Sequence, residues 1–585
     1  MELSDFRGFH NEPIRIIREN PLNPCEALES LKSVESAFNR FKNGGTRVTW
    51  EAYRNQIQET GKLPEDWYIL GIDLGTTNSV ISYWDNNNSR PEAIDVSNGF
   101  GKIPLPSVVQ YREDEDEWLV GEEAYRSMKI YPETTVRSIK RLMGTDRLTK
   151  LGKNEYLPEE ISAKILGELV SHAQTINPKA ELAGLVVSVP YDFDDAAQKA
   201  TVRACEIAGI ADKLICLIKE PNAAALAYNF RHQLNEGERV MVFDFGGGTL
   251  DITLFHVKER NESKIKLQVI SQGGEAYHGG DDVDAYLIEA CGNFIKAKTG
   301  QAAAEHAIEN QVEIIARARE AKERLSGVQR FRIPFTFCIP PFVEQITREE
   351  LHTLIKPFIE KTRKLVLKAL RETYTGSCTP DTLSRVLLEG GSSQMPWVRE
   401  MLLDIFNDEG KIYSSERPAL DISLGATYYA AMKMGLLSHP DLESEMSVEF
   451  EVAVSHDIGL EIDGAKKAFF PMIRRGTPYA LAKKSHVFTL SGNTPAEMTS
   501  LDLRILERIQ QDDPFEQCKL IGEVSIKGLP ERPSGKTKLR ITLMVEEEGG
   551  LVRGMVEDLG IGEEFPSSGY RESFEPSRFK KAELG

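Results

Sequence analysis

Near the middle of the chain, the segment Phe243–Asp251 (FDFGGGTLD) carries residue types suited to binding phosphate. Apolar residues alternate on both sides of it, which predicts two strands joined by a glycine-rich turn. The glycines Gly246–Gly248 let the backbone approach a ligand closely and direct bare N–H groups towards it. Asp244 before the turn and Asp251 after it place two carboxylates where a phosphate-bound metal ion would lie.

An earlier segment, residues 71–80 (GIDLGTTNSV), repeats this pattern. Aligning Asp73 with Asp244 also superposes Gly75 on Gly246. The offset of 171 residues (244 − 73) is far longer than a solenoid repeat and suits two similar lobes. Each lobe would then supply one phosphate-binding hairpin, with a nucleotide in the cleft between them.

The elements around these hairpins divide the chain into five parts. From Trp67 strands and helices alternate, which is typical of α/β architecture, and after residue 437 short alternating segments with turn signals between them predict a β-sandwich. We therefore expect a helical N-terminal extension (1–66), an α/β nucleotide-binding domain (67–437), a linker (438–449), a β-sandwich (450–565) beginning with a strand at 450–454, and a disordered tail (566–585).

Helices are predicted at four further places. Within the α/β domain they are expected to run unbroken over 303–326 and 348–371. In the N-terminal extension we expect helices over 27–41 and from Trp50, with Thr49 as the cap of the second. This pair would either pack on the next domain or dock a partner, and packing is favoured because no chemistry-bearing motif lies here.

The length and composition of the chain limit the classes of protein to which it can belong. A chain of 585 residues implies about three or four domains at roughly 150 residues each. The net charge of −19 argues against binding nucleic acid or an anionic membrane, and no apolar run is long enough to span a bilayer. The N-terminus lacks a secretory pattern, and the seven cysteines are scattered without CxxC pairs, which favours reduced thiols. A cytoplasmic protein is expected.

Eight short motifs follow one another between residues 71 and 396. They are GIDLGTTNSV (71–80), KRLMG (140–144), VVSVPYDFDDAAQKAT (186–201), KEPNAAALAY (219–228), FDFGGGTLD (243–251), HGGDDVD (278–284), AKERLS (321–326) and LLEGGSSQMP (387–396). Their order and spacing resemble the heat-shock protein 70 (DnaK-type) chaperone family, and the resemblance covers residues 68–565. It implies an actin-like ATPase of two lobes with a duplicated, ribonuclease-H-like core, then a peptide-binding β-sandwich, with ATP or ADP, Mg²⁺ and K⁺ as ligands.

The resemblance also assigns roles to residues of the hairpins and their surroundings. Lys140 would position the γ-phosphate and the attacking water, Glu220 would assist the metal and the water, and Asp73 and Asp244 would hold Mg²⁺ through its waters. Phosphoryl transfer needs such neutralised charge and a water held in line. The phosphates would lie between Gly75, Thr76, Thr77 and Asn78 on one side and Gly246, Gly247, Gly248 and Thr249 on the other, K⁺ would bind Thr249 and Asp251, and the nucleotide would also contact Gly280, Lys322, Ser326, Gly390, Gly391 and Ser392.

Taken singly, these residues have plainer interpretations. Lys140 could be a surface lysine, and Glu220 a carboxylate that stabilises the start of a helix. In the sandwich, Phe488, Leu501 and Leu503 align with the family's peptide pocket, but apolar strand residues are more often ordinary core. The full constellation favours the functional interpretation for the nucleotide residues and leaves both interpretations open for the sandwich.

Several positions depart from the family pattern. Glu323 and Gln394 stand where many members stack adenine between two arginines, and Gln198 replaces the arginine that relays nucleotide state to the linker. Cys216 aligns with an arginine that docks J-domain co-chaperones, and residues 446–453 replace the usual acidic, leucine-rich linker. Only the predicted tail follows the sandwich, where members carry a long helical lid. We therefore expect a short, lidless, atypical member that exchanges peptide quickly.

The sequence thus predicts an ATP-dependent, chaperone-like protein that hydrolyses ATP and binds exposed hydrophobic peptide segments. Its partners would be unfolded or partly folded polypeptides, with a J-domain co-chaperone and a nucleotide exchange factor. The alternative is a nucleotide-gated scaffold or regulator that binds one defined protein partner, which the altered linker and missing lid favour. An actin-like small-molecule kinase or filament former is a weaker alternative, because a β-sandwich follows the ATPase.

Overall fold

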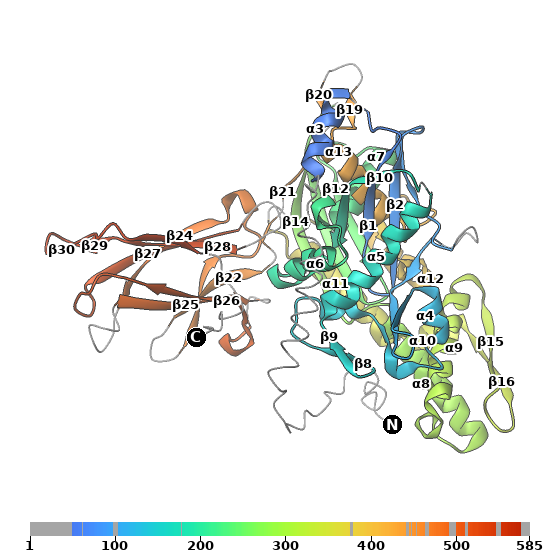
Figure 1. The fold of residues 1–585 in the computed structure, drawn as a ribbon. Helices are drawn as coiled ribbons and strands as arrows, with labels where there is room; N and C mark the ends of the chain where they lie inside the picture. The colour runs from blue at the N-terminus through green and yellow to red at the C-terminus, as the bar shows by residue number, and fades with distance from the viewer. Residues whose placement is uncertain are drawn as a thin grey trace.

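The computed structural model describes residues 49–574, except for 61, 98–102, 177, 262, 375–377, 440–443, 446, 452, 455, 463–466, 491–498, 509–512 and 546–551. The helix predicted over 27–41 and the end of the predicted tail, residues 575–585, lie outside the described residues. Figure 1 shows an α/β body from which a β-sandwich projects to one side.

A mixed sheet forms the centre of the first lobe. Its strand order is β11-β10-β1-β2-β3, with bounds β1 (Trp67–Asp73), β2 (Asn78–Asp85), β3 (Arg90–Ala93), β10 (Glu181–Val189) and β11 (Leu214–Lys219). β1 pairs in parallel with β10 and antiparallel with β2. Nearly all of β10 is apolar and buried, as expected for a strand covered on both faces of a sheet.

The sheet of the second lobe repeats this order. It runs β18-β17-β12-β13-β14-β21, with bounds β12 (Arg239–Phe245), β13 (Thr249–Arg260), β14 (Lys264–Ala276), β17 (Arg385–Glu389), β18 (Ile412–Ser414) and β21 (Ser447–Glu451). β12 takes the place of β1, again parallel to one neighbour and antiparallel to the other. Asp73 lies opposite Val80 in its hairpin, and Asp244 opposite Asp251. The duplication predicted from the two glycine-rich segments is confirmed in register.

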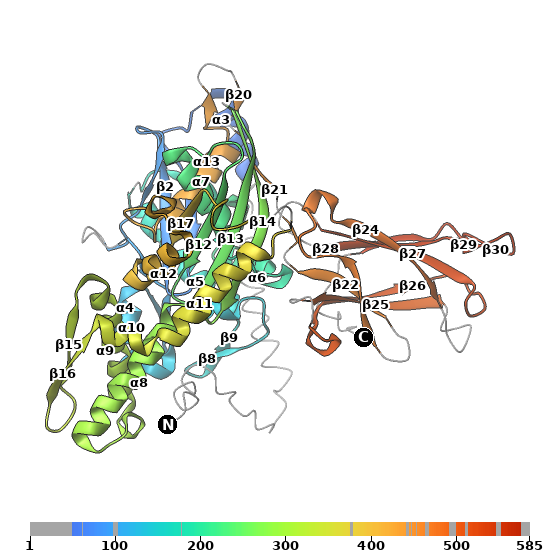
Figure 2. The ribbon, with the colours of Figure 1, turned by 180° about the vertical axis from the view of Figure 1, so that it is seen from behind.

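Two helices rich in small residues, α7 (Glu220–His232) and α13 (Asp421–Lys433), pack against each other at the junction of the lobes. Gly425 permits this close crossing, because a Cβ there would collide with the backbone of Ala223. The first sheet is also covered by α5 (Pro158–Ile176) and α6 (Asp195–Ile207). The second lobe is covered by α8 (Gly280–Thr299), α9 (Ile308–Gly327), α11 (Lys356–Arg371) and α12 (Pro396–Phe406), and Figure 2 shows α11 lying across β13 and β14.

Both long helices predicted in the second lobe are interrupted. The first consists of a 3₁₀ turn at Ala303–Glu305 followed by α9. The second is divided at Ile355 into α10 (Arg348–Leu354) and α11. Pro357 accounts for this division, because proline lacks an N–H and is tolerated only in the first turn of a helix.

The boundary between the two domains differs from the prediction. The strand expected at the start of the sandwich belongs instead to the ATPase-like body, because β21 pairs in parallel with β14 from Lys264↔Ser447 to Gln268↔Glu451. The side-chain amide of Gln268 donates a hydrogen bond to Glu451 Oε1 over 2.7 Å, and this bond fixes the β14–β21 pairing at the Glu451 end. The described sandwich strands begin at Asp457.

The sandwich consists of two antiparallel four-stranded sheets, β23-β22-β25-β26 and β24-β27-β28-β31. The bounds are β22 (Asp457–Ile462), β23 (Ala468–Ile473), β24 (Lys483–Leu490), β25 (Ser500–Arg508), β26 (Lys519–Lys527), β27 (Thr537–Val545), β28 (Val552–Asp558) and β31 (Arg571–Phe574). The prediction of a disordered tail from residue 566 is wrong for its first part, since β31 pairs with β28 and buries Phe574 in the core.

The second predicted N-terminal helix is present as α3 (Trp50–Thr60) and packs on the first lobe. Tyr53 and Ile57 are buried, and the Tyr53 ring meets Trp67 edge-on at 4.5 Å. The Tyr53 hydroxyl donates to Glu181 and accepts from Lys213 Nζ at 2.9 Å. For the described part of the extension, the favoured interpretation of packing on the next domain is therefore confirmed.

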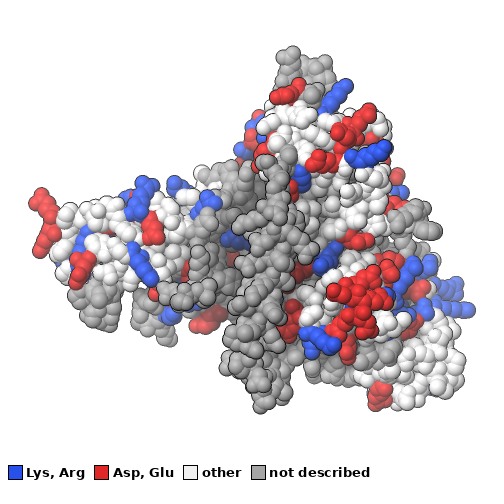
Figure 3. All heavy atoms as spheres, in the orientation of Figure 1, with Lys and Arg blue, Asp and Glu red and all other residues white. Residues whose placement is uncertain are grey.

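Three further observations concern the surface, the helices and the cysteines of the described residues. Figure 3 shows both acidic and basic side chains on the face that it presents, with acidic side chains gathered in one patch on the α/β body. None of the helices in the described part of the chain is long and apolar enough to cross a membrane. The six cysteines that fall within it are free thiols.

Gly425→Ala is expected to lower the apparent melting temperature, because the new Cβ forces α7 and α13 apart. Overpacking of this kind costs about 1–3 kcal/mol. Gly167→Ala is the matched control, since a Cβ at this position of α5 meets nothing within 4 Å and alanine favours helix by about 0.5–1 kcal/mol. Differential scanning calorimetry should show opposite shifts, and equal shifts would contradict the tight crossing.

Candidate nucleotide site

The two glycine-rich hairpins face each other across a cavity of about 370 Å³ between the lobes. Seventeen of the nineteen residues predicted for catalysis, cofactor or metal line this cavity, namely Asp73, Gly75, Thr76, Thr77, Asn78, Lys140, Glu220, Asp244, Gly246, Gly247, Gly248, Thr249, Lys322, Ser326, Gly390, Gly391 and Ser392. Gly280 lies against its wall, where a Cβ would collide with Ser392, and Asp251 lines a neighbouring cavity instead. Residues far apart in the chain are thus brought together as predicted.

Close approach between the lobes explains the glycines Gly247 and Gly248 of the second turn. A Cβ on Gly247 would collide with the Thr77 side chain, and one on Gly248 would come within 2.6 Å of Thr76. Gly390 adopts a φ of 76°, and its Cβ would lie 2.7 Å from Asp244 Oδ1. The hairpins of the two lobes therefore touch, and their turns present backbone and small side chains to the space where phosphates would lie.

A buried ion pair lies at the floor of the cavity. Lys140 Nζ is 2.5 Å from Glu220 Oε1, and both side chains are 7% exposed. Lys140 comes from a 3₁₀ turn of the first lobe (Ile139–Leu142), and Glu220 begins α7. Burial alone would lower the pKa of Lys140, but Glu220 and Asp73 more than reverse this. Burial raises the pKa of Glu220 to about 7 against the opposing effect of Lys140.

Three further carboxylates lie close to this pair. Burial raises the pKa of Asp73 although Lys140 and a 2.9 Å hydrogen bond from Ser188 oppose the shift. Burial and neighbouring carboxylates raise the pKa of Asp244 and Asp251 well above the usual range. Asp251 Oδ2 is buried without a hydrogen-bond partner. So much buried negative charge is unfavourable unless a cation shares the site.

These residues fit a hydrated Mg²⁺ better than a fully protein-ligated one. Nowhere in the described chain do three carboxylate, His or Cys side chains converge closely enough to bind a metal ion. Mg²⁺ keeps several of its waters and is usually bound through one or two carboxylates and the phosphates of a substrate. Asp73 and Asp244 stand at equivalent positions of the two hairpins and are the carboxylates that could accept hydrogen bonds from such waters.

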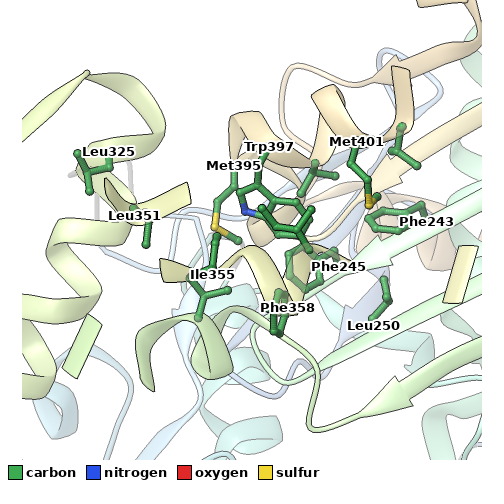
Figure 4. Packing of buried hydrophobic residues seen from close by; sticks show 14 of the residues in the cluster. Phe243, Phe245, Leu250, Leu325, Leu351, Ile355, Phe358, Met395, Trp397 and Met401 are labelled. Atoms are coloured by element: carbon green, nitrogen blue, oxygen red, sulfur yellow. The ribbon is translucent and has the colours of Figure 1, made fainter. Parts of the chain in front are cut away.

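The hairpin of the second lobe rests on an aromatic layer. The Phe245 ring packs against Trp397 at 5.6 Å and Phe358 at 6.1 Å between centroids. Figure 4 shows these rings together with Phe243 and Leu250 in one continuous core. Because close-packed aromatic side chains resist displacement, this layer fixes the turn that carries the glycines.

The far end of the cavity differs from the phosphate end. Lys322 Nζ donates to the Gly280 carbonyl at 2.8 Å and lies 2.9 Å from Asp284. Glu323, which replaces an expected arginine, instead forms an ion pair with Arg319 at 3.1 Å. Gln394 lies on the same wall. An acid and an amide thus stand where two arginines were expected, and the guanidinium of Arg319, paired with Glu323, also lies on the cavity wall.

Arg141 is a residue of this region that sequence reasoning missed. Its Nη2 donates to the Gly248 carbonyl at 2.7 Å, and its guanidinium lies 4.9 Å from the Tyr277 ring. It thereby joins the first lobe directly to the glycine turn of the second. The sequence signal was present as a second cation beside Lys140, but only contact across the lobes reveals its role.

The residues predicted to line a peptide pocket are not equally accessible. Leu503 is 5% exposed and belongs to the sandwich core. Phe488 and Leu501 are half-buried against the same core. Their assignment to a peptide pocket stays a prediction, and Leu503 could meet a peptide only if the surrounding strands separated.

The fold defines a two-lobed α/β domain followed by a β-sandwich. A family model described as Hsp70 protein matches residues 69–557. "Chaperone protein DnaK" of Thermosipho melanesiensis is 30% identical over 508 residues, covering 85% of this chain and 79% of the relative. The protein of the same name from Thermotoga petrophila is 31% identical over 509 residues, with the same shares covered. The chain belongs to the Hsp70 family.

Asp244→Asn should raise the melting temperature of the nucleotide-free protein by roughly 2 °C or more. A carboxylate whose pKa is raised on folding is unfavourable while ionised, so stability is lost as pH rises above the unfolded-state pKa, and a neutral amide removes that loss. The rise in melting temperature on adding Mg²⁺ and ATP should become smaller. Asp404→Asn, at an exposed ion pair with Arg363, is the control and should change neither value.

Proposed function

We propose that this protein is an ATP-hydrolysing chaperone of the Hsp70 family that binds exposed apolar peptide segments. The observation that carries the proposal is the buried Lys140–Glu220 pair facing two opposed glycine hairpins and an acidic cluster. Family membership supports the same activity. Bound Mg²⁺ would neutralise phosphate charge and K⁺ would lie by Thr249 and Asp251.

In this proposal each residue near the phosphates has one task. The backbone N–H groups of the glycine turns hold the phosphates, and Lys140 Nζ donates to the γ-phosphate and the attacking water. Glu220 orients that water, and its pKa of about 7 suits a group that takes up a proton at Oε1 or Oε2 near neutral pH. Lys322, Ser326 and Ser392 hold the nucleoside. Contact between the hairpins keeps the phosphates out of bulk water.

β21 (Ser447–Glu451) leads into the sandwich while it is paired with the second-lobe sheet, and this docked linker supports coupling between ATP and the sandwich. β21 extends the sheet that carries Asp244, so this sheet joins the phosphate turn directly to the segment leading into the sandwich. Tyr191 donates to the Ala453 carbonyl at 2.7 Å, and Arg475 Nη2 to the Gln272 carbonyl at 2.8 Å. A nucleotide that binds the docked and undocked arrangements unequally would shift their populations.

Partners and location belong to the same proposal. Unfolded or partly folded polypeptides would be clients, with a J-domain co-chaperone and an exchange factor as regulators, in the cytoplasm. A second candidate is a nucleotide-gated scaffold that binds one defined partner, favoured by the burial of Leu503 in the sandwich core. Binding to a peptide array separates them, since a chaperone prefers many apolar segments and a scaffold selects one.

Lys140→Ala should slow single-turnover ATP hydrolysis by about 100-fold or more, because charge stabilisation at the γ-phosphate is lost. Nucleotide binding, measured by calorimetry, should remain within about tenfold, since the glycine turns still hold the phosphates. Lys150→Ala, an exposed lysine of the same lobe, is the matched control. An unchanged hydrolysis rate in Lys140→Ala would exclude the assigned role.

The dissociation rate of a fluorescent apolar peptide with ATP bound should differ about 5–150-fold from the rate with ADP bound, which is the usual range of allosteric coupling. Glu451→Ala removes a hydrogen-bond partner of the docked linker and should reduce the difference. Glu564→Ala, an exposed acid of the sandwich, should leave it unchanged. Equal rates with both nucleotides in the unaltered protein would show that the domains are not coupled.

A further inference from the structure

A second cavity, of about 490 Å³, adjoins the nucleotide cavity on the side of the sandwich. Thr76, Lys140 and Thr249 line both cavities, so they form the partition between them. These three residues surround the place where the proposed function puts the γ-phosphate. The phosphate end of the nucleotide site therefore borders the second cavity, and the nucleoside end does not.

Buried polar atoms without partners mark the inner part of this second cavity. Gln272 is 7% exposed; its Oε1 accepts from Tyr374 at 2.6 Å, but its amide nitrogen has no hydrogen-bond partner. Arg141 Nε and Asp251 Oδ2 are also buried without partners. Three residues that line one space next to Lys140 therefore carry two donors and one acceptor without partners. Inorganic phosphate matches this set, because its oxygens accept from the donors and its own hydroxyl donates to a carboxylate.

The outer wall of the cavity belongs to the other domain. His456, Arg475, Glu507 and Lys519 of the sandwich line it opposite β14 and α11. Lys519 forms an ion pair with Asp194 of the first lobe, and Arg475 reaches the Gln272 carbonyl. The space thus lies between the hydrolysis site and an interface that changes when the sandwich moves.

We propose that the phosphate released by hydrolysis leaves through this second cavity, and that the docked sandwich slows its exit. The proposal rests on the proposed ATPase function. Water adds to the γ-phosphorus, the bond to the bridging oxygen breaks, and ADP keeps that oxygen while the phosphate takes the water oxygen. One proton of the water passes to Glu220 and the other stays on the phosphate as its hydroxyl. ADP still fills the first cavity from the glycine turns to the Gln394 end. The phosphate, formed at the partition, meets Arg141 and Gln272 on its other side.

Lys519→Ala tests the outer wall, because it removes the pair with Asp194 without touching the nucleotide cavity. Lys467→Ala is the matched control, a sandwich lysine whose ion pair with Glu461 lies away from the second cavity. Ala276→Trp tests the part of the cavity beside the partition, since Ala276 lines the cavity opposite Thr249 on the neighbouring strand. Acid quench measures hydrolysis in a single turnover, and a fluorescent phosphate-binding sensor in stopped flow measures release.

Release should be at least threefold faster in Lys519→Ala and at least threefold slower in Ala276→Trp, with hydrolysis unchanged in Lys519→Ala and in the control. Unchanged release in both variants, with normal hydrolysis, would overturn this route while leaving the ATPase function intact. Failure of the unaltered protein to hydrolyse ATP would overturn the ATPase function and the route together.

Discussion

The site depends on one electrostatic constraint, namely that several carboxylates are buried around a single lysine. Lys140 compensates Glu220 directly and Asp73 and Asp244 in part, whereas Asp251 lies among the carboxylates of Asp192, Glu220 and Asp244. In a low-dielectric interior this excess of negative charge favours any arrangement that brings cations or N–H donors close. The acidic cluster, the glycine-rich turns and the contact between the lobes thus depend on one another. Each would be energetically unfavourable if the others were absent.

The two halves of the site are positioned in the same way, because each lobe uses the same arrangement of strands. One central strand ends at Asp73 and its equivalent ends one residue after Asp244, and their hairpins reverse direction with the same register. The small residues of α7 and α13 then let the two lobes approach. A change at Gly425 or Ala223 would alter the distance between the hairpins without touching the nucleotide cavity.

The local chemistry of the site could be predicted from the sequence, because glycine turns and flanking carboxylates are contiguous motifs whose spacing is printed in the chain. Lys140 and Glu220 needed the family resemblance, since neither carries a local signal beyond its charge. Arg141 was missed because its contacts lie on another lobe. The boundaries of the elements were harder to predict. Pro357 is a sequence signal for the division between α10 and α11, but β21 shows the same alternation of residues as a sandwich strand. Only its pairing with β14 shows which sheet it joins.

That pairing has one more consequence, for self-association. β14 would be the outermost strand of its sheet if β21 were not beside it, with a row of unpaired N–H and C=O groups open to any extended chain. Release of the linker would therefore expose two complementary edges at once, one on the sheet and one on the linker. Two copies of the chain could then satisfy each other by exchanging these strands, as in domain swapping. The charged side chains of Glu449 and Glu451 beside Lys264 and Lys266 favour the native partner through opposite charge, but a second copy carries the same charges.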